Sequence, residues 1–180
     1  MALKLHLGCG KRDFGPGWFN VDGGHFPHVK HHDILNLPFG QDEVDLIYAS
    51  HVFEYFDQVQ GLDLLKTWRG HLKPGGTLRL AVPDFEILSK LYSEGKIALR
   101  QVLGPLFGRM PMDDLTIYHR TTYDFATLSA SLNEAGFRNV RRYDWRVTEH
   151  AGFDDHSQAY IPHMDKNNGV LISLNVEAYK

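Results

Sequence analysis

Cysteine is almost absent from this sequence, since Cys9 is the single one among 180 residues. One cysteine excludes a disulfide within the chain and is typical of a reducing compartment, so we expect a cytoplasmic protein. Long apolar runs are also missing, so no membrane span is predicted. The formal net charge of -3 disfavours a nucleic-acid partner held mainly by phosphate contacts.

The remaining composition is that of an ordinary globular domain, with 43% hydrophobic and 23% charged residues. A chain of this length fits one domain with a substantial core. Candidate strands alternate with candidate helices, which predicts an α/β fold with a Rossmann-like, mostly parallel sheet. Residues 170–179 alternate in polarity and predict a half-buried last strand, antiparallel to its neighbours.

The first predicted strand covers residues 3–7 and ends at the turn Gly8-Cys9-Gly10. Glycines at the carboxyl end of a strand allow a ligand to approach the main chain closely. A second strand, residues 18–22, ends in the carboxylate of Asp22. The ten residues between the strands are too few for a helix with two turns. We therefore predict a parallel pair joined by a loop, a first helix that is reduced or missing, and one thinly covered sheet face.

The elements that follow are predicted from periodicity and from breakers. A helix over residues 57–72 ends at Lys73-Pro74-Gly75-Gly76, and another begins at Thr121 or Thr122 and ends at Gly136. Further strands are expected at residues 28–33, 44–49, 77–82 and 140–145, and helices at 85–92 and 97–103. Residues 104–105 and 108–114 read as irregular. The stretch 84–120 is too broken for a simple crossover, so we expect an insertion that covers a site.

The two strand ends favour an adenosine-containing ligand, because a carboxylate placed like Asp22 can accept both hydroxyls of a ribose. Dinucleotide-binding proteins carry a third glycine and a helix whose N-terminus holds the pyrophosphate. Here the third glycine position is Asp13, and no helix is expected. S-adenosylmethionine has ribose and adenine but no phosphate, and therefore fits better than NAD or FAD.

Five motifs in the first half of the chain carry a family resemblance: Leu7-Gly8-Cys9-Gly10 and residues 17–22, 33–39, 49–56 and 72–77. With them the chain resembles class I S-adenosylmethionine-dependent methyltransferases. More narrowly, it resembles small methyltransferases associated with bacterial cell-surface polysaccharide biosynthesis. The resemblance implies S-adenosyl-L-methionine as cofactor and a class I methyltransferase sheet in a single domain.

The resemblance also implies roles for individual residues. The methionine part of the cofactor would pass over the first turn, Asp22 would hold the ribose with Gly23 beside it, and the β-strand end at residues 49–50 would accept from the ammonium. His51 and Glu54 would lie near the transferring methyl group. The cofactor set is Gly8, Cys9, Gly10, Asp22, Gly23, Asp33, Ile34, Ala49 and Ser50, in which Asp33 and Ile34 would meet the adenine.

The acceptor side rests on polar side chains near that strand end and in two later segments. His51 and His119 are candidate general bases, since a hydroxyl acceptor profits from a base. The candidate substrate-binding residues are Glu54, Tyr118, Tyr123, His156 and Tyr160. Each also has a purely structural interpretation, such as a histidine bonded to nearby backbone or, for Asp33, a turn cap. The histidines at positions 25, 28, 31 and 32 match no zinc spacing, and no metal is expected.

The sequence thus predicts methyl transfer to a small-molecule or carbohydrate acceptor, with a place in polysaccharide biosynthesis implied by the resemblance. Three alternatives stay open. One is a cofactor-binding or regulatory module that has lost catalysis, and another is an NAD-dependent oxidoreductase. The third is a dimeric scaffold that uses the thinly covered sheet face, so a homodimer is also among the expectations.

Overall fold

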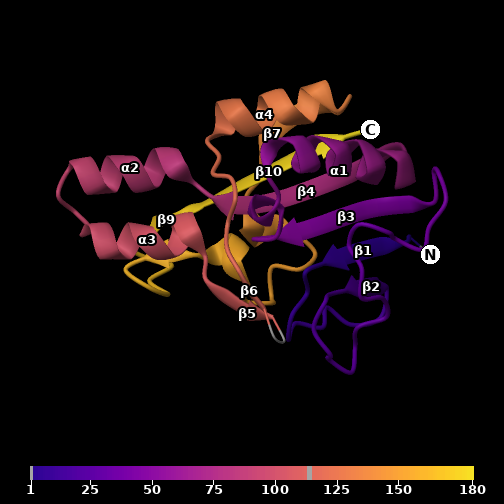
Figure 1. The fold of residues 1–180 in the computed structure, drawn as a ribbon, viewed down its shortest axis with the longest axis horizontal. Helices are drawn as coiled ribbons and strands as arrows, with labels where there is room; N and C mark the ends of the chain where they lie inside the picture. Colours follow the sequence, from indigo (N-terminus) through magenta and orange to yellow (C-terminus); the bar gives the residue numbers. More distant parts are fainter. Residues whose placement is uncertain (1, 113–114) are drawn as a thin grey trace.

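A six-stranded sheet forms the centre of the molecule in a computed structural model that describes residues 2–112 and 115–180 (Figure 1). Its strand order is β2-β1-β3-β4-β10-β7. The strands are β1 Lys4–Leu7, β2 Trp18–Val21, β3 Val44–Ser50, β4 Leu72–Pro83, β10 Ser173–Tyr179 and β7 Arg138–Arg142. The first four run parallel, and β10 lies antiparallel between β4 and β7. The expected mostly parallel α/β sheet with an antiparallel last strand is confirmed.

The link between β1 and β2 contains no helix in residues 8–17, all of which the structure describes. The two strands pair in parallel with Lys4 opposite Trp18 and Leu7 opposite Val21. The predicted loop crossover is therefore confirmed. It leaves the carboxyl ends of β1, β2 and β3 at one edge of the sheet, where ligands bind in open α/β folds.

Helices α1 (Gln58–His71) and α4 (Phe125–Glu134) cover one face of the sheet (Figure 1). Alternate strand residues such as Leu5, Ile47 and Leu80 meet Leu65 and Trp68 of α1 there. All five side chains are at most 1% exposed, so this face supplies most of the hydrophobic stabilisation. The helix predicted over residues 57–72 is confirmed.

The opposite sheet face is covered without a long helix. Phe14 stacks on His6 with ring centroids 3.9 Å apart and on His150 at 5.4 Å. Tyr48 lies 4.1 Å from His150 and donates its hydroxyl to Asp155 over 2.5 Å. The short 3-10 helices η2 (Trp145–Val147) and η3 (His156–Gln158) belong to the covering segment, residues 144–169. The expectation of a thinly covered face is wrong, because aromatic side chains and this segment fill it.

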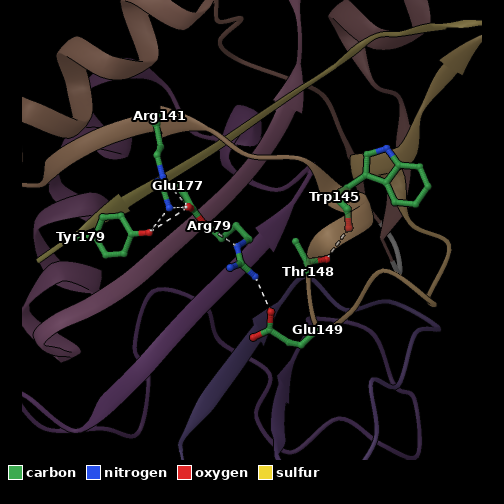
Figure 2. Close-up of polar contacts among 7 residues, drawn as sticks. All are labelled: Arg79, Arg141, Trp145, Thr148, Glu149, Glu177 and Tyr179. Atoms are coloured by element: carbon green, nitrogen blue, oxygen red, sulfur yellow. Dashed lines mark hydrogen bonds and ion pairs between the residues drawn. The ribbon is translucent and has the colours of Figure 1, made fainter.

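The covering segment also buries the second face of β10, so this strand is buried along nearly its whole length. Glu177 and Tyr179 of β10 belong to a charged network on the covered face (Figure 2). Glu177 pairs with Arg141 at 2.7 Å and with Arg79 at 3.3 Å, and Arg79 also reaches Glu149 at 2.8 Å. Polar alternation in β10 therefore marks a buried network instead of a solvent-facing side.

Several element boundaries differ from the sequence expectations. Residues 28–33 form no strand, and within this described stretch a parallel bridge joins His31 to Val21. The side chains of His28, His31 and His32 instead bond to backbone carbonyls of neighbouring loops. Strand β7 ends at Arg142, three residues before the expected end at 145.

Two helix ends also differ. Helix α4 is capped by Asp124, whose carboxylate accepts from the Thr127 N–H at 2.7 Å, while the Thr121 hydroxyl bonds to the Phe56 carbonyl. Residues 73–76 end α1 as predicted, but the chain there already belongs to β4. The β3–β4 register shifts at this point, where Gly75 takes a φ of 78°.

The segment after β4 holds two helices and a hairpin. Helix α2 (Phe85–Ser93) agrees with the prediction. Helix α3 (Leu99–Phe107) extends past Pro105, where an irregular segment was expected. Strands β5 (Met110–Met112) and β6 (Leu115–Ile117) pair where the prediction gave an irregular 108–114, and residues 113–114 lie outside the described part. Strand β8 (Tyr160–Ile161) pairs with β9 (Val170–Leu171) beside the second core, which includes Leu88, Val102 and Ile172. Among the described residues, no helix is long and apolar enough to cross a membrane.

Candidate functional site

The turn after β1 and the carboxylate after β2 form one hydrogen-bonded unit. The Asp22 carboxylate accepts from the Gly10 N–H at 2.7 Å with one oxygen and from the Gly24 N–H at 2.7 Å with the other. Each oxygen keeps a second lone pair that a ribose hydroxyl can use. The structure thus brings Gly8, Gly10 and Asp22 together as the sequence predicted.

Gly8 is required by both conformation and space. Its φ of 65° lies in the left-handed region, and an added Cβ would lie 2.1 Å from Cγ2 of Val52. Cys9 between the glycines is buried, and this burial, followed by the nearby charge of Asp22, raises the pKa of its thiol to about 12. The thiol is therefore neutral and is no nucleophile.

The predicted adenine contact at Asp33 is occupied by local bonds. One carboxylate oxygen accepts from the Leu35 N–H at 2.8 Å and the other from the Asn36 amide at 2.7 Å. The Asn36 and then the Leu35 hydrogen bonds lower the pKa of Asp33. This carboxylate closes the turn that contains Ile34, which is the turn-cap interpretation left open by the sequence.

The end of β3 holds Ala49, Ser50 and a bent residue, His51. The Ser50 hydroxyl is buried and has no hydrogen-bond partner among the described residues. His51 takes a φ of 53°, which is uncommon for a residue with a side chain and often marks a functional position. Its N–H donates to the Ala81 carbonyl of β4 at 2.8 Å.

Three predicted site residues meet just beyond this bend. Glu54, in the 3-10 helix η1 (Phe53–Tyr55), has a fully buried side chain whose Oε1 lies 3.4 Å from Nδ1 of His51 and 3.7 Å from Nε2 of His119. Burial raises the pKa of Glu54 to about 8. Burial also lowers the pKa of His51 well below its usual value, and it lowers that of His119. Both imidazoles are therefore neutral near pH 7.

The other predicted substrate residues separate into those near this cluster and those away from it. The ring of His156 lies 5.3 Å from that of His51, and Tyr118 precedes His119 with its side chain exposed. Tyr123 stacks on Phe53 inside the core, where burial raises its pKa to about 12. Tyr160 is buried at a different place, where its hydroxyl accepts from Trp145 and Arg146.

Several residues at the site were not identified from the sequence. Ser173 bonds to Nε2 of His51 at 3.1 Å, and Asn175 in turn accepts from Ser173 at 3.0 Å. Their polar alternation inside an apolar strand was the available signal. Arg12 donates to the Asp154 carbonyl and is a positive charge facing His51 and His156. A Cβ on Gly23 would lie 2.4 Å from Cε of Met112, so the β5–β6 hairpin lies over the end of β2.

The donor and acceptor set at this edge fits S-adenosylmethionine. Asp22 has lone pairs for a ribose, and the positive-φ glycines expose main chain beside it. The unpartnered Ser50 hydroxyl lies at the strand end expected for the amino-acid part of the cofactor. The third glycine position of a dinucleotide-binding motif is Asp13, and residues 8–17 form no helix whose N-terminus could hold a pyrophosphate.

Comparisons with known proteins agree with this geometry. A family model described as a methyltransferase domain matches residues 18–80, so the match begins at β2, after the first glycine turn. No curated protein matches the chain. Among solved structures, an S-adenosylmethionine-dependent methyltransferase from Archaeoglobus fulgidus is 16% identical, with a TM-score of 0.61 over 99% of this chain and 86% of that one.

Two further solved structures have the same fold. An S-adenosylmethionine-dependent methyltransferase from Mesorhizobium loti is 18% identical, with a TM-score of 0.53 over 99% of this chain and 90% of that one. A chain from the complex of the Haloferax volcanii Trm112 methyltransferase activator with a methyltransferase is 18% identical, with a TM-score of 0.56 over 99% and 82% of the two chains. At these identities the neighbours show the fold, a Rossmann-like class I methyltransferase fold. Residues 18–80 thus match a methyltransferase domain, and the chain has the fold of these S-adenosylmethionine-dependent enzymes.

Proposed function

We propose that the chain transfers a methyl group from S-adenosylmethionine to a polar group of a small-molecule or sugar acceptor. The observation that carries this proposal is the convergence at one sheet edge. The Gly8–Gly10 turn bonded to Asp22 lies there, and so does the end of β3. Just beyond that end, His51, Glu54 and His119 lie close together in space. A place in cell-surface polysaccharide synthesis is the finer form of the proposal and rests on the motif resemblance.

The cofactor residues in this proposal follow the strand ends. Asp22 binds the ribose hydroxyls, and the main chain of Gly8, Cys9 and Gly10 lies against the methionine part. Ala49 and Ser50 receive the ammonium group, and the turn at Asp33 and Ile34 lies at the adenine. S-adenosylmethionine supplies a methyl group that is already activated on a sulfonium. The task left to the protein is therefore to hold the acceptor in line with it.

The acceptor side is built around neutral imidazoles. A general base must be unprotonated at the working pH, and burial lowers the pKa of both His51 and His119. The His156 ring lies beside that of His51, Tyr118 directly precedes His119, and Glu54 contacts both candidate bases. If either histidine is the base, activity persists below pH 6.5 and falls only at a lower pH. Tyr123 and Tyr160 act through packing in this scheme, since the first lies in the core and the second is bonded to Trp145 and Arg146.

We also propose a single methyltransferase domain with residues 84–120 as an insertion that covers the site. Its support comes from two contacts on described residues. Met112 lies against Gly23 at the end of β2, and His119 lies against Glu54 beyond the end of β3. The two contacts flank the region where a cofactor bound to Asp22 and Ser50 would lie.

The test is calorimetric titration with S-adenosylhomocysteine on the wild type, Asp22→Ala and Asp33→Ala. Micromolar binding that is lost in Asp22→Ala supports the pocket. Weaker binding in Asp33→Ala supports an adenine contact, whereas unchanged binding indicates that Asp33 is only a turn cap. Absence of binding to the folded wild type contradicts the proposal. Radiolabelled methyl transfer to nucleotide sugars and to simple hydroxyl and amine compounds then tests the acceptor class.

A cofactor-binding module without catalysis is the second candidate, and one observation favours it. The His51 and His119 side chains are only 14% and 7% exposed, and both ring nitrogens of each histidine already face protein atoms. This candidate predicts tight S-adenosylhomocysteine binding with no methyl transfer to any acceptor. Turnover that His51→Ala or His119→Ala abolishes without changing cofactor affinity contradicts it.

A further inference from the structure

The hydrogen-bond partners around the buried cluster of Glu54, His51 and His119 determine the tautomer of both imidazoles. The chain of bonds that fixes His51 begins at the Ser157 carbonyl, which can only accept. It accepts from the Asn175 side-chain nitrogen at 2.8 Å, so the Asn175 oxygen must face Ser173.

The Ser173 hydroxyl is therefore used as a donor to Asn175, over 3.0 Å. Its oxygen is left to accept from Nε2 of His51 at 3.1 Å, so this nitrogen carries the hydrogen. In the neutral imidazole, Nδ1 then bears a lone pair. That lone pair faces Oε1 of Glu54 at 3.4 Å.

His119 reaches the same state by a shorter route. Its Nδ1 lies 2.9 Å from the Pro105 carbonyl oxygen and must donate to it. The lone pair is then on Nε2, which faces the same Oε1 of Glu54 at 3.7 Å. The ring is also held by Tyr55, which meets it edge-on with centroids 4.6 Å apart, and by Gly108, where no Cβ would fit.

Two imidazole lone pairs thus face Oε1 of Glu54, and neither carboxyl oxygen has a hydrogen-bond partner among the described residues. An ionised carboxylate would meet two acceptors and no donor at a fully buried position, which is strongly unfavourable. A proton on Glu54 removes this conflict, because the acid can donate to either nitrogen.

We propose that Glu54 is a neutral carboxylic acid and a positioning residue, whose one proton is shared between His51 and His119 and fastens residues 119–121 to the carboxyl end of β3. The Glu54 backbone carbonyl reinforces this link, since it accepts from the N–H groups of Arg120 at 2.8 Å and Thr121 at 3.2 Å. The shared proton occupies the lone pair of one histidine at a time. The consequence for cofactor binding rests on the proposed function.

The surroundings of the cluster favour the neutral acid. Burial raises the pKa of Glu54 to about 8 and lowers the pKa of both histidines. The other ionisable groups that face it are Tyr55 and Tyr123 toward Glu54, and His156 and Arg12 toward His51. Arg12, which is cationic, and His156 both face the His51 ring and disfavour a positive charge on it.

The test is NMR on the full chain with labelled histidine and glutamate, which needs neither cofactor nor acceptor. At pH 7 we expect His51 protonated on Nε2 alone and His119 on Nδ1 alone. The Glu54 side-chain carboxyl carbon is expected to titrate near pH 8. Titration of that carbon near its ordinary value, or a doubly protonated His51 or His119 at pH 7, overturns the proposal.

Glu54→Gln is the conservative variant, because its amide donates to the same lone pairs without titrating. It should keep both tautomers, whereas a merely space-filling role for Glu54 predicts no link between its protonation and the histidine signals. Glu86→Gln, an exposed change on α2, is the matched control that leaves the titration unchanged.

For wild type, S-adenosylhomocysteine affinity should weaken about tenfold from pH 7 to pH 9, while the affinity of Glu54→Gln should stay constant. A wild-type profile as flat as that of the variant counts against the proposal. Absence of binding at every pH contradicts the proposed function and leaves the NMR result to decide.

Discussion

Gly8 shows how a single residue at the end of β1 is constrained twice. It needs a left-handed backbone, at φ 65°, and an open space where a Cβ would meet Val52 at 2.1 Å. Gly10 needs only the backbone, at φ 52°, since nothing lies within 4 Å of its Cβ position. We therefore expect Gly10→Ala to cost about 1–2 kcal/mol and Gly8→Ala about 1–3 kcal/mol more. Urea unfolding of both variants measures the difference, and equal losses would show that the Val52 contact relaxes freely.

Glu54 gives the chain a pH dependence opposite to that of most carboxylates. Burial raises its pKa from 4.5 to about 8, so its stabilising contribution is complete below the unfolded pKa and is lost as pH rises toward 8. Relative to Glu54→Gln, the wild-type free energy of unfolding should fall between pH 5 and pH 8, by at most about 1.4 kcal/mol per pH unit. Urea unfolding at successive pH values measures this. Parallel profiles for the two proteins would mean that folded Glu54 is already ionised.

At the scale of elements, the sequence predicted best where local signals and packing agree. The strand-glycine turn, the missing first helix and α1 with its breakers all follow from spacing alone. Residues 28–33 were misread as a strand, because their histidine side chains bond to backbone carbonyls in place of a regular ladder. The last strand was predicted to be half-buried, but Ser173 and Asn175 are buried. Ser173 bonds to His51, and Asn175 bonds to the Ser157 carbonyl of a segment whose position the pattern does not reveal.

The network on the covered face of the sheet makes β10 and β7 depend on one buried acid, Glu177 (Figure 2). Burial would raise its pKa, but the bonds from Arg141 and Tyr179 and the charge of Arg79 lower it overall. Its stabilising contribution is thus present at neutral pH and is lost as pH falls through the lowered pKa. We expect Glu177→Ala to cost about 3–5 kcal/mol, because it leaves Arg79 buried with one fewer partner.

The matched control for this network is Glu149→Ala. Glu149 bonds to the same Arg79 at 2.8 Å, but its side chain is 39% exposed. Water can replace much of that contact, so a loss below about 1 kcal/mol is expected. Urea unfolding of the two variants at neutral pH compares them directly. Similar losses of unfolding free energy would show that the stability of the network depends on Arg79 and not on Glu177.

At the scale of the whole molecule, the two faces of the sheet are covered in different ways. One face carries α1 and α4 over a fully apolar core, and the other carries an aromatic and charged layer under residues 144–169. The sequence could not show this cover, because the segment has no periodic pattern and gains its structure from Phe14, Tyr48 and His150. A dimer through an open sheet face therefore loses its structural basis. The site instead lies at the sheet edge, where the loops after β1, β2 and β3 meet the hairpin.

This arrangement predicts that cofactor binding protects parts of the molecule far apart in sequence. S-adenosylhomocysteine at one hundred times its Kd should stabilise the fold by about 2.7 kcal/mol, and the Asp22→Ala variant should show no gain. Amide hydrogen exchange should slow locally at residues 8–10, 22–24 and 49–52, and at residues 115–121 of the proposed cover. Amides of α1 and α4, on the other face, should slow only through the global gain. Slowing at the strand ends without slowing at 115–121 would mean that the cofactor binds here but that the insertion does not close over it.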